Sequence, residues 1–282
     1  MISPRMTQRM AYFICALCTV IVIAPVLFII GMIVVKGWSA IHWEFLTAMP
    51  RMGMRAGGIF PAIIGTFYLV ATTMLIATPL GILAAVYLVE YAKDNGLKRL
   101  VEVAIVNLAG VPSIVYGLFG MGLFVIFLKM GACILAGALT LAIMTLPVII
   151  TATKEALNSV PKTFREVSLS LGATRWQTIR YSVLPNALPG ILTGTVLGLS
   201  RAAGETAPIL FTVAAFYLPR LPHSIFDRVM VLPYHLYVLS TQVPNVKPHI
   251  QYGTALVLVS LVLILNLFAV IVRARFRRRK NW

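Results

Sequence analysis

Six long runs of apolar residues limit what this chain can fold into. A helix needs about 20 predominantly apolar residues to cross the hydrocarbon core of a bilayer, and each run is long enough. The runs therefore predict an all-α polytopic membrane protein with six transmembrane helices. They lie at about 11–35, 61–89, 101–128, 132–152, 189–217 and 251–272.

The composition excludes a soluble globular domain. Of the 282 residues, 60% are hydrophobic and 11% are charged, whereas soluble domains carry roughly 25% charged residues. The formal net charge of +16 does not indicate a nucleic-acid partner, because nucleic-acid-binding proteins set their basic residues on a solvated face. Cys15, Cys18 and Cys133 all lie in apolar runs, so no disulfide or metal framework is expected.

The basic residues predict how the chain is oriented. With six spans both termini lie on one side, which carries 16 of the 24 lysines and arginines, while the other side carries seven. By the positive-inside rule the richer side is cytoplasmic, so we expect both termini in the cytoplasm. The first run follows Arg5 and Arg9 as in a signal sequence. It exceeds the signal's apolar region of about 7–15 residues, so we expect a retained span.

The longest polar stretch, 153–188, is predicted on the cytoplasmic side and contains a short amphipathic helix at 161–171. Its first residue is a proline, which suits the first turn of a helix, and Gly172 is a residue type favoured just past a helix end. Such a helix either lies on the lipid headgroups or inserts into a cleft on another protein, and periodicity alone does not separate the two. Residues at i, i+3 and i+7 form one apolar stripe along it: Phe164, Val167 and Leu171.

A second short helix is predicted directly after the first. Thr174 and Gln177 have the spacing of a capping box, in which each side chain bonds the other residue's backbone N–H at a helix start. The run then continues through Trp176 to the Leu184-Pro185 pair. We expect two short helices joined at Ala173.

The sequence contains no motif for catalysis or for an energy source. It has no G-x-x-x-x-G-K-[ST] phosphate-binding loop and no HExxH pattern. We therefore expect no enzyme activity, no catalytic residues, no metal site and no cofactor, and we expect any ATP hydrolysis in a partner subunit. The histidines fall in predicted external loops, where we expect solvated side chains: His42, His223, His235 and His249.

A charged pair lies inside the fifth run. Arg201 and Glu205 are four residues apart, which places them on one face of a helix, where they can form a salt bridge. An arginine at the bilayer centre costs about 2.5–3.5 kcal/mol on insertion scales. The pair either holds the helix against a neighbour or forms a substrate gate, in which Arg201 binds an oxyanion that displaces Glu205. We favour the gate, with Thr206 as a further contact and a kink at Pro208.

A further candidate site is the break at 110–113 in the third run, Gly-Val-Pro-Ser. Proline removes a backbone donor and leaves nearby amides free, and a helix start of this kind can donate N–H groups to an anion. Asn107 and Ser113 are the candidate contacts. The alternative is a plain kink that helps the helices pack, because glycine and proline are frequent in membrane helices.

Small residues recur in the fifth run. Gly190, Gly194 and Gly198 lie at strict four-residue spacing, which is typical of a face where membrane helices approach closely. The face either packs within the chain or contacts a partner subunit.

The spacing in the cytoplasmic loop resembles a known motif. Glu166 is followed six residues later by Gly172 and then, after nine further residues, by a four-residue block that ends in Leu184-Pro185. This is similar to the EAA loop of ABC-transporter permease subunits, although the two alanines and the isoleucine of that motif are replaced here. In that family the loop docks onto the ATPase subunit. The resemblance implies that Glu166, Gly172, Phe164 and Ala173 couple the chain to an ATPase.

Further segments narrow the resemblance. From about residue 55 to its end, the chain resembles the PstA-type permease subunits of bacterial high-affinity phosphate ABC transporters, within the binding-protein-dependent transport system inner membrane component family. This implies the type I ABC importer permease fold and a bacterial inner-membrane location. It also implies a second, PstC-like permease, two PstB-like ATPase subunits and an external PstS-like phosphate-binding protein. The segments that carry it are 57–66, 81–91, 109–117 and 201–208.

These features predict a permease subunit of an ATP-driven phosphate importer, in contact with membrane lipid and inorganic phosphate. Residues 1–60 would form an N-terminal transmembrane helix and external loop, and 61–282 a permease core of five helices that includes the coupling loop 153–188. One alternative is a permease for another oxyanion, such as sulfate or molybdate. Another is an ion-coupled anion carrier that uses Arg201 and Glu205 and that would keep its transport without the loop.

Overall fold

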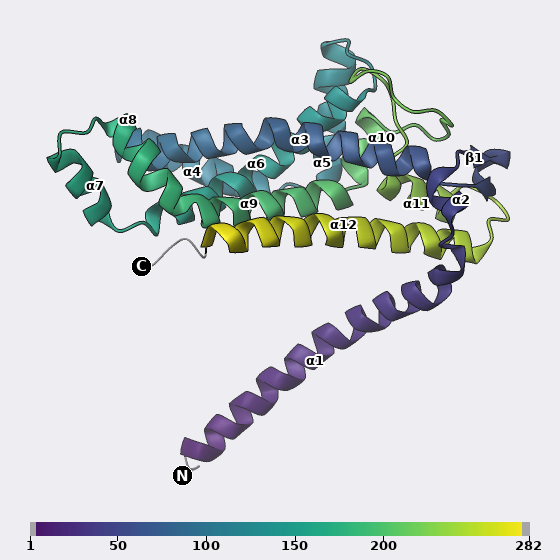
Figure 1. Cartoon of the computed structure of the whole chain (residues 1–282), viewed down its shortest axis with the longest axis horizontal. Helices are drawn as coiled ribbons and strands as arrows, with labels where there is room; N and C mark the ends of the chain where they lie inside the picture. The colour runs from purple at the N-terminus through teal and green to yellow at the C-terminus, as the bar shows by residue number, and fades with distance from the viewer. Residues whose placement is uncertain (1–3, 278–282) are drawn as a thin grey trace.

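A computed structural model describes residues 4–277, and helices dominate it (Figure 1). Five helices are long and apolar enough to cross a membrane, and a sixth span results if a bent pair, α4 with α5, is counted as one. The prediction of an all-α polytopic protein with six spans is confirmed. The five straight spans contain α1 (Pro4–Gly37), α3 (Phe60–Val86), α6 (Ile134–Asn158), α9 (Leu184–Gly204) and α12 (Pro248–Arg277).

Helix α6 forms the centre of the bundle. Helices α3 and α9 pack along it, and α4 (Gly96–Ala109), α5 (Ser113–Gly120) and α10 (Ala207–Thr212) contact it as well. Small residues allow the close approach of α6 and α9, because a Cβ atom added to Gly194 would lie 2.5 Å from the Cβ atom of Ala152. The four-residue glycine spacing in α9 therefore marks a packing face within the chain.

The first and last spans lie at the edge of the bundle. Helix α12 runs along α9, whereas α1 contacts α12 near one end and then diverges from the bundle (Figure 1). The crossing requires Gly37, since an added Cβ atom would lie 2.6 Å from the carbonyl oxygen of Tyr252. Within the described residues, the most apolar windows of α1 and α12 contain no buried residue. Their surfaces are therefore left for lipid or for another protein.

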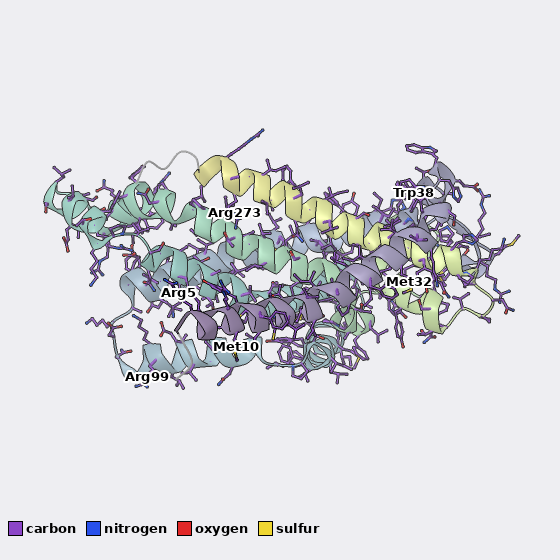
Figure 2. All side chains as sticks on the ribbon, turned by 90° about the horizontal axis from the view of Figure 1, so that it is seen from below. Arg5, Met10, Met32, Trp38, Arg99 and Arg273 are labelled. Atoms are coloured by element: carbon purple, nitrogen blue, oxygen red, sulfur yellow. The ribbon has the colours of Figure 1, made fainter. Side chains whose placement is uncertain are left out.

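The two ends of the bundle carry different connections. At one end, which we call the docking-loop end after the loop at 153–188, α7 (Lys162–Ser170) and α8 (Arg175–Thr178) connect α6 to α9. Helix α1 begins and helix α12 ends toward the same end. Figure 2 places Arg5, Arg99 and Arg273 toward this end and Trp38 toward the opposite, hairpin end. The hairpin end holds short elements: η1 (Trp38–Ala40), α2 (Trp43–Thr47), strands β1 (Pro50–Arg51) and β2 (Ala56–Gly57), which pair antiparallel, η2 (Met52–Met54) and α11 (Leu232–Thr241).

The third span is sharply bent. Helices α4 and α5 meet at 102°, and α5 continues as the π-helix η4 (Met121–Phe127). Pro112 has no N–H to donate to the carbonyl of Leu108, four residues earlier. That carbonyl instead accepts hydrogen bonds from the N–H of Val111 at 3.2 Å and from the hydroxyl of Tyr116 at 2.7 Å. A side chain thus replaces the backbone bond that the proline removes.

The fifth span is not one continuous helix, so the prediction that Arg201 and Glu205 share one helical face is wrong. Helix α9 ends at Gly204, the backbone of Glu205 is extended (φ −73°, ψ 140°), and α10 begins at Ala207. Pro208 provides the physical reason, because it cannot donate a hydrogen bond to the carbonyl of Gly204. The proline therefore separates two helices instead of kinking one.

The predicted external loop 218–250 contains a buried helix, α11. The Thr66 hydroxyl of α3 accepts a hydrogen bond from the N–H of Leu232 at 2.9 Å, which fixes the start of α11. His235 on this helix is only 2% exposed. The expectation of a solvated side chain is therefore wrong for His235, because tertiary packing covers a segment that composition suggested was a loop.

We expect Gly194→Leu to lower the melting temperature of the purified protein in detergent. The added side chain overlaps Ala152, and overpacking of this kind costs about 1–3 kcal/mol. Gly122→Leu is the matched control, because an added Cβ atom there meets nothing within 4 Å. Equal melting temperatures for the two variants would contradict the assigned α6–α9 interface.

Candidate functional site: a charged pair between two helix breaks

Arg201 and Glu205 face each other across the end of α9. The Nε atom of Arg201 lies 3.6 Å from Oε1 of Glu205, and the two side chains are 30% and 19% exposed. This contact is longer than the 2.7–2.9 Å of a charge-assisted hydrogen bond. The guanidinium therefore keeps its N–H donors available for a ligand. Arg201 also lies in the last turn of α9, where the negative end of the helix dipole favours a cation.

The two helix breaks lie next to each other. Helix α5 packs against α10 at Gly117, where an added Cβ atom would lie 2.9 Å from Cα of Pro208 and 3.0 Å from the carbonyl oxygen of Ala207. Tyr116, whose hydroxyl bonds Leu108, is buried and lies within electrostatic range of Arg201. The break after α4 and the break after α9 therefore form one region of interrupted helix.

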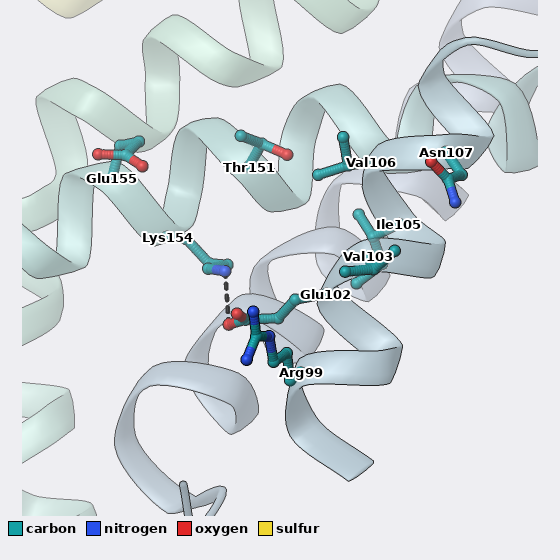
Figure 3. A pocket seen from close by; sticks show the side chains of 9 residues that line it. All are labelled: Arg99, Glu102, Val103, Ile105, Val106, Asn107, Thr151, Lys154 and Glu155. Carbon is teal, nitrogen blue, oxygen red and sulfur yellow. Dashed lines mark hydrogen bonds and ion pairs between the residues drawn. The ribbon is translucent and has the colours of Figure 1, made fainter. Parts of the chain in front are cut away.

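The predicted contacts divide between two places. Thr206 lies between α9 and α10 beside Glu205, and Ser113 is the first residue of α5, one turn before Tyr116. Asn107 belongs to a separate cavity of about 440 Å³ between α4 and α6 (Figure 3). Neither Arg201 nor any of its neighbours at the α9 end lines that cavity.

The α4–α6 cavity contains an ion pair of its own. The Nζ atom of Lys154 lies 2.6 Å from Oε1 of Glu102 (Figure 3), and Arg99 lines the same cavity. Thr151 and Glu155 line the α6 side. With two cations and two carboxylates, the cavity has no excess of positive charge that would favour an anion.

The loop at 153–188 folds only partly as the sequence predicts, because the second helix is not short: it continues through Arg175–Gly204 into the fifth span. Thr174 and Gln177 form both bonds of the capping box, at 3.3 Å and 2.8 Å, and α8 is followed by the π-helix η5 (Ile179–Val183), which leads into α9. Gly172 has a φ of +82°, in the left-handed region that a side chain disfavours. Gly172 and Ala173 form the corner between the two helices.

The apolar stripe on α7 is only partly used inside the chain. Phe164 packs against the buried cluster around Ile179, whereas Val167 is 60% and Leu171 83% exposed. The Glu166 side chain is exposed as well and makes no ion pair with any described residue. This combination leaves an apolar stripe with an unpaired carboxylate beside it on the surface.

Comparison with known proteins assigns the family. The model of the family described as "Binding-protein-dependent transport system inner membrane component" matches residues 77–282. The chain belongs to this family. The probable ABC transporter permease protein YqgI of Bacillus subtilis is 34% identical over 95% of this chain and 95% of its own.

The names of two further relatives of this chain include a substrate. The phosphate transport system permease protein PstA 1 of Mycobacterium tuberculosis is 34% identical over 93% of this chain and 86% of its own. The probable phosphate transport system permease protein PstA of Methanocaldococcus jannaschii is 36% identical over 93% and 91%.

Solved structures confirm the fold of the inner membrane component. A bacterial ABC transporter for the import of alginate matches with a TM-score of 0.70 over 96% of this chain and 97% of that one, at 17% identity. The MetNI methionine ABC transporter matches with a TM-score of 0.60 over 77% of this chain and 97% of that one, also at 17% identity. The predicted type I ABC importer permease fold is confirmed by this likeness.

Sequence reasoning missed one residue of the candidate site, Tyr116. Its position one turn beyond Pro112 was the available signal, because a hydroxyl at that distance can reach the carbonyl that the proline leaves without a donor. That Tyr116 lies within electrostatic range of Arg201 had no sequence signal, since 85 residues separate the two positions.

A buried histidine lies outside the candidate site. Burial lowers the pKa of His235 from 6.5 to about 4, and its two ring nitrogens have no hydrogen-bond partner among the described residues. The imidazole of His235 is therefore buried in its neutral form at the hairpin end, and its protonation destabilises the folded state.

We expect the stability of the protein to fall by about 2 kcal/mol between pH 7 and pH 5 because of His235. The unfolded chain binds a proton below pH 6.5, whereas the folded chain does so only near pH 4. Stability therefore rises with pH in this window. His235→Leu should flatten the pH dependence of the melting temperature, whereas His223→Leu, at an exposed site, should not. A slope unchanged by His235→Leu would contradict the assignment.

Proposed function

We propose that this chain is a permease subunit of an ATP-driven phosphate importer in a bacterial inner membrane. It forms the translocation path together with a second, related permease and performs no catalysis itself. The names of its relatives, two of which are phosphate transport system permeases, support the substrate. The family match supports the class of transporter.

The observation that carries the proposal is the loose Arg201–Glu205 pair. An intramembrane arginine retains N–H donors, and a guanidinium binds tetrahedral oxyanions through parallel hydrogen bonds. In the proposed gate, phosphate takes the place of Glu205 on Arg201, with Thr206 and the start of α5 at Ser113 as further donors. When the anion leaves, Glu205 pairs with Arg201 again and closes the site.

The docking loop supports an external source of energy. In the proposed transporter, two ATPase subunits bind one permease each. On this chain the ATPase contacts the exposed stripe of α7, Glu166 and the corner at Gly172 and Ala173. An external phosphate-binding protein delivers the anion to the hairpin end. The basic residues toward the docking-loop end, including Arg5, Arg99 and Arg273, support a cytoplasmic position for that end and for both termini.

Two other functions make different predictions. A permease for sulfate or molybdate would use the same arginine, and competition for uptake separates these anions from phosphate. An ion-coupled carrier would use Arg201 and Glu205 without an ATPase, so removal of 153–188 would leave most of its transport. The proposed importer would lose transport completely.

We expect Arg201→Ala to reduce uptake of radiolabelled phosphate at least 100-fold in proteoliposomes that contain the complete transporter. The complex should still assemble, because the 3.6 Å contact of Arg201 with Glu205 is too long for a strong hydrogen bond and contributes little to the fold. Arg228→Ala is the matched control, an exposed arginine at the hairpin end, and should retain normal uptake. Normal uptake by Arg201→Ala contradicts the gate, and wild-type uptake of sulfate in preference to phosphate contradicts the proposed substrate.

We expect Gly172→Val to weaken co-purification of the ATPase subunit roughly tenfold. A β-branched residue is strained at a φ of +82°, so the corner between α7 and α8 must rearrange. Gly172→Asn is the control, because asparagine tolerates left-handed backbone. Equal recovery of the ATPase with both variants would place the contact elsewhere.

A further inference from the structure

Two arginines of the docking loop reach the same short segment of another span. Helix α3 ends in a π-helix, η3 (Tyr87–Tyr91), and π-helical turns often occur at functional positions. Arg165 of α7 bonds Glu90, 75 residues away in the sequence. The guanidinium of Arg175, at the start of α8, lies 5.8 Å from the ring centre of Tyr91. Both docking helices therefore contact neighbouring residues at the end of α3.

The Arg165–Glu90 contact is tight. Nη2 of Arg165 donates to Oε1 of Glu90 at 2.7 Å, and Nε donates to the same oxygen at 3.1 Å. The side chains are only 20% and 10% exposed. A mostly buried pair with well-placed hydrogen bonds holds its two segments far more firmly than an exposed pair. The pair between Glu44 and Arg51, with side chains 61% and 70% exposed at 3.8 Å, has the opposite character.

Arg165 also closes the end of α6. Its Nη1 and Nη2 atoms donate to the carbonyls of Val160 at 2.9 Å and Leu157 at 3.0 Å. Carbonyls at a helix C-terminus have no partner within the helix. One guanidinium thus joins the end of α6, the docking helix α7 and the end of α3.

Helix α3 has no covalent link to the docking loop, whereas α6 and α9 continue directly into it. The loop can therefore move α3 through the packing of α6 and α9 on it or, directly, through the side-chain contacts at 87–91. Along its length α3 packs on α6 and α9, and at the hairpin end it bonds α11 through Thr66. A displacement of α7 that is transferred to Glu90 reaches the opposite end of the bundle through one helix.

We infer that Arg165 and Glu90 form a clasp that transfers movement of the docking loop to α3, with Arg175 and Tyr91 as a second, weaker contact. Both residues are positioning residues that bind no substrate. The inference rests on the proposed function, because it describes how an ATPase bound at α7 acts on the membrane helices. It predicts that a broken clasp uncouples ATP hydrolysis from transport while the complex remains assembled.

The test uses Glu90→Gln, which keeps the size of the side chain and removes its charge, and Glu90→Asp, which keeps the charge. Each complete transporter is purified and reconstituted, and ATP hydrolysis and radiolabelled phosphate uptake are measured together. We expect Glu90→Gln to retain ATP hydrolysis within about twofold and to import at least tenfold less phosphate per ATP. Glu90→Asp should import an amount of phosphate per ATP between those of the wild type and Glu90→Gln. Asp94→Asn, at an exposed carboxylate that pairs with Lys98, is the control and should leave the phosphate imported per ATP unchanged.

A purely structural role gives a different result. If Glu90→Gln lowers assembly, hydrolysis and uptake in parallel, or leaves all three unchanged, the clasp does not couple the loop to α3. Hydrogen exchange of 87–91 provides a readout without transport: ATP should change protection there in the wild-type complex and not in Glu90→Gln. Failure of the proposed function appears instead as a wild-type complex that hydrolyses ATP without importing phosphate, and the exchange measurement then still decides the clasp.

Discussion

Backbone hydrogen bonding inside a bilayer is the constraint on which the rest of the structure depends. No water is available in the hydrocarbon core, so each carbonyl that a proline leaves without a donor must find another partner. At the first break the hydroxyl of Tyr116 bonds the carbonyl of Leu108. At the start of α11 the hydroxyl of Thr66 accepts the N–H of Leu232. Side-chain hydroxyls therefore satisfy backbone groups where helices are interrupted or begin inside the protein.

The same interruptions explain where the membrane charge is placed. Helix α9 ends at Gly204, four residues before Pro208. Arg201 therefore lies in the last turn of the helix, where the helix dipole favours a cation. The extended backbone of Glu205 then directs a carboxylate back toward the guanidinium at 3.6 Å. In an unbroken helix Arg201 and Glu205 would lie on one face, and the helix backbone would fix the distance between them. A broken helix lets the two groups separate without unwinding further turns.

Local patterns made much of the chain predictable. Apolar runs predicted the six spans, and the Thr174–Gln177 spacing and Gly172 predicted the cap of α8 and the corner before it. The continuation of α8 into α9 was not predicted. Contacts between distant residues carried no such signal. The Arg165–Glu90 clasp joins positions 75 residues apart, and the burial of His235 depends on packing at the hairpin end. The 102° bend at the third span was missed because proline reveals a break but not its angle. The candidate site residues remain a prediction.

The clasp also explains why the stripe on α7 stays exposed. At about 100° per residue, Val167 and Leu171 lie roughly 200° and 240° around the helix from Arg165, so they face away from it. Rotating α7 about its axis would pull Arg165 off Glu90 and off the carbonyls of Leu157 and Val160. Five hydrogen bonds of Arg165 at a mostly buried site oppose that rotation. In the proposed function this stripe is the surface that contacts the ATPase, and the hydrogen bonds of Arg165 hold α7 in that orientation.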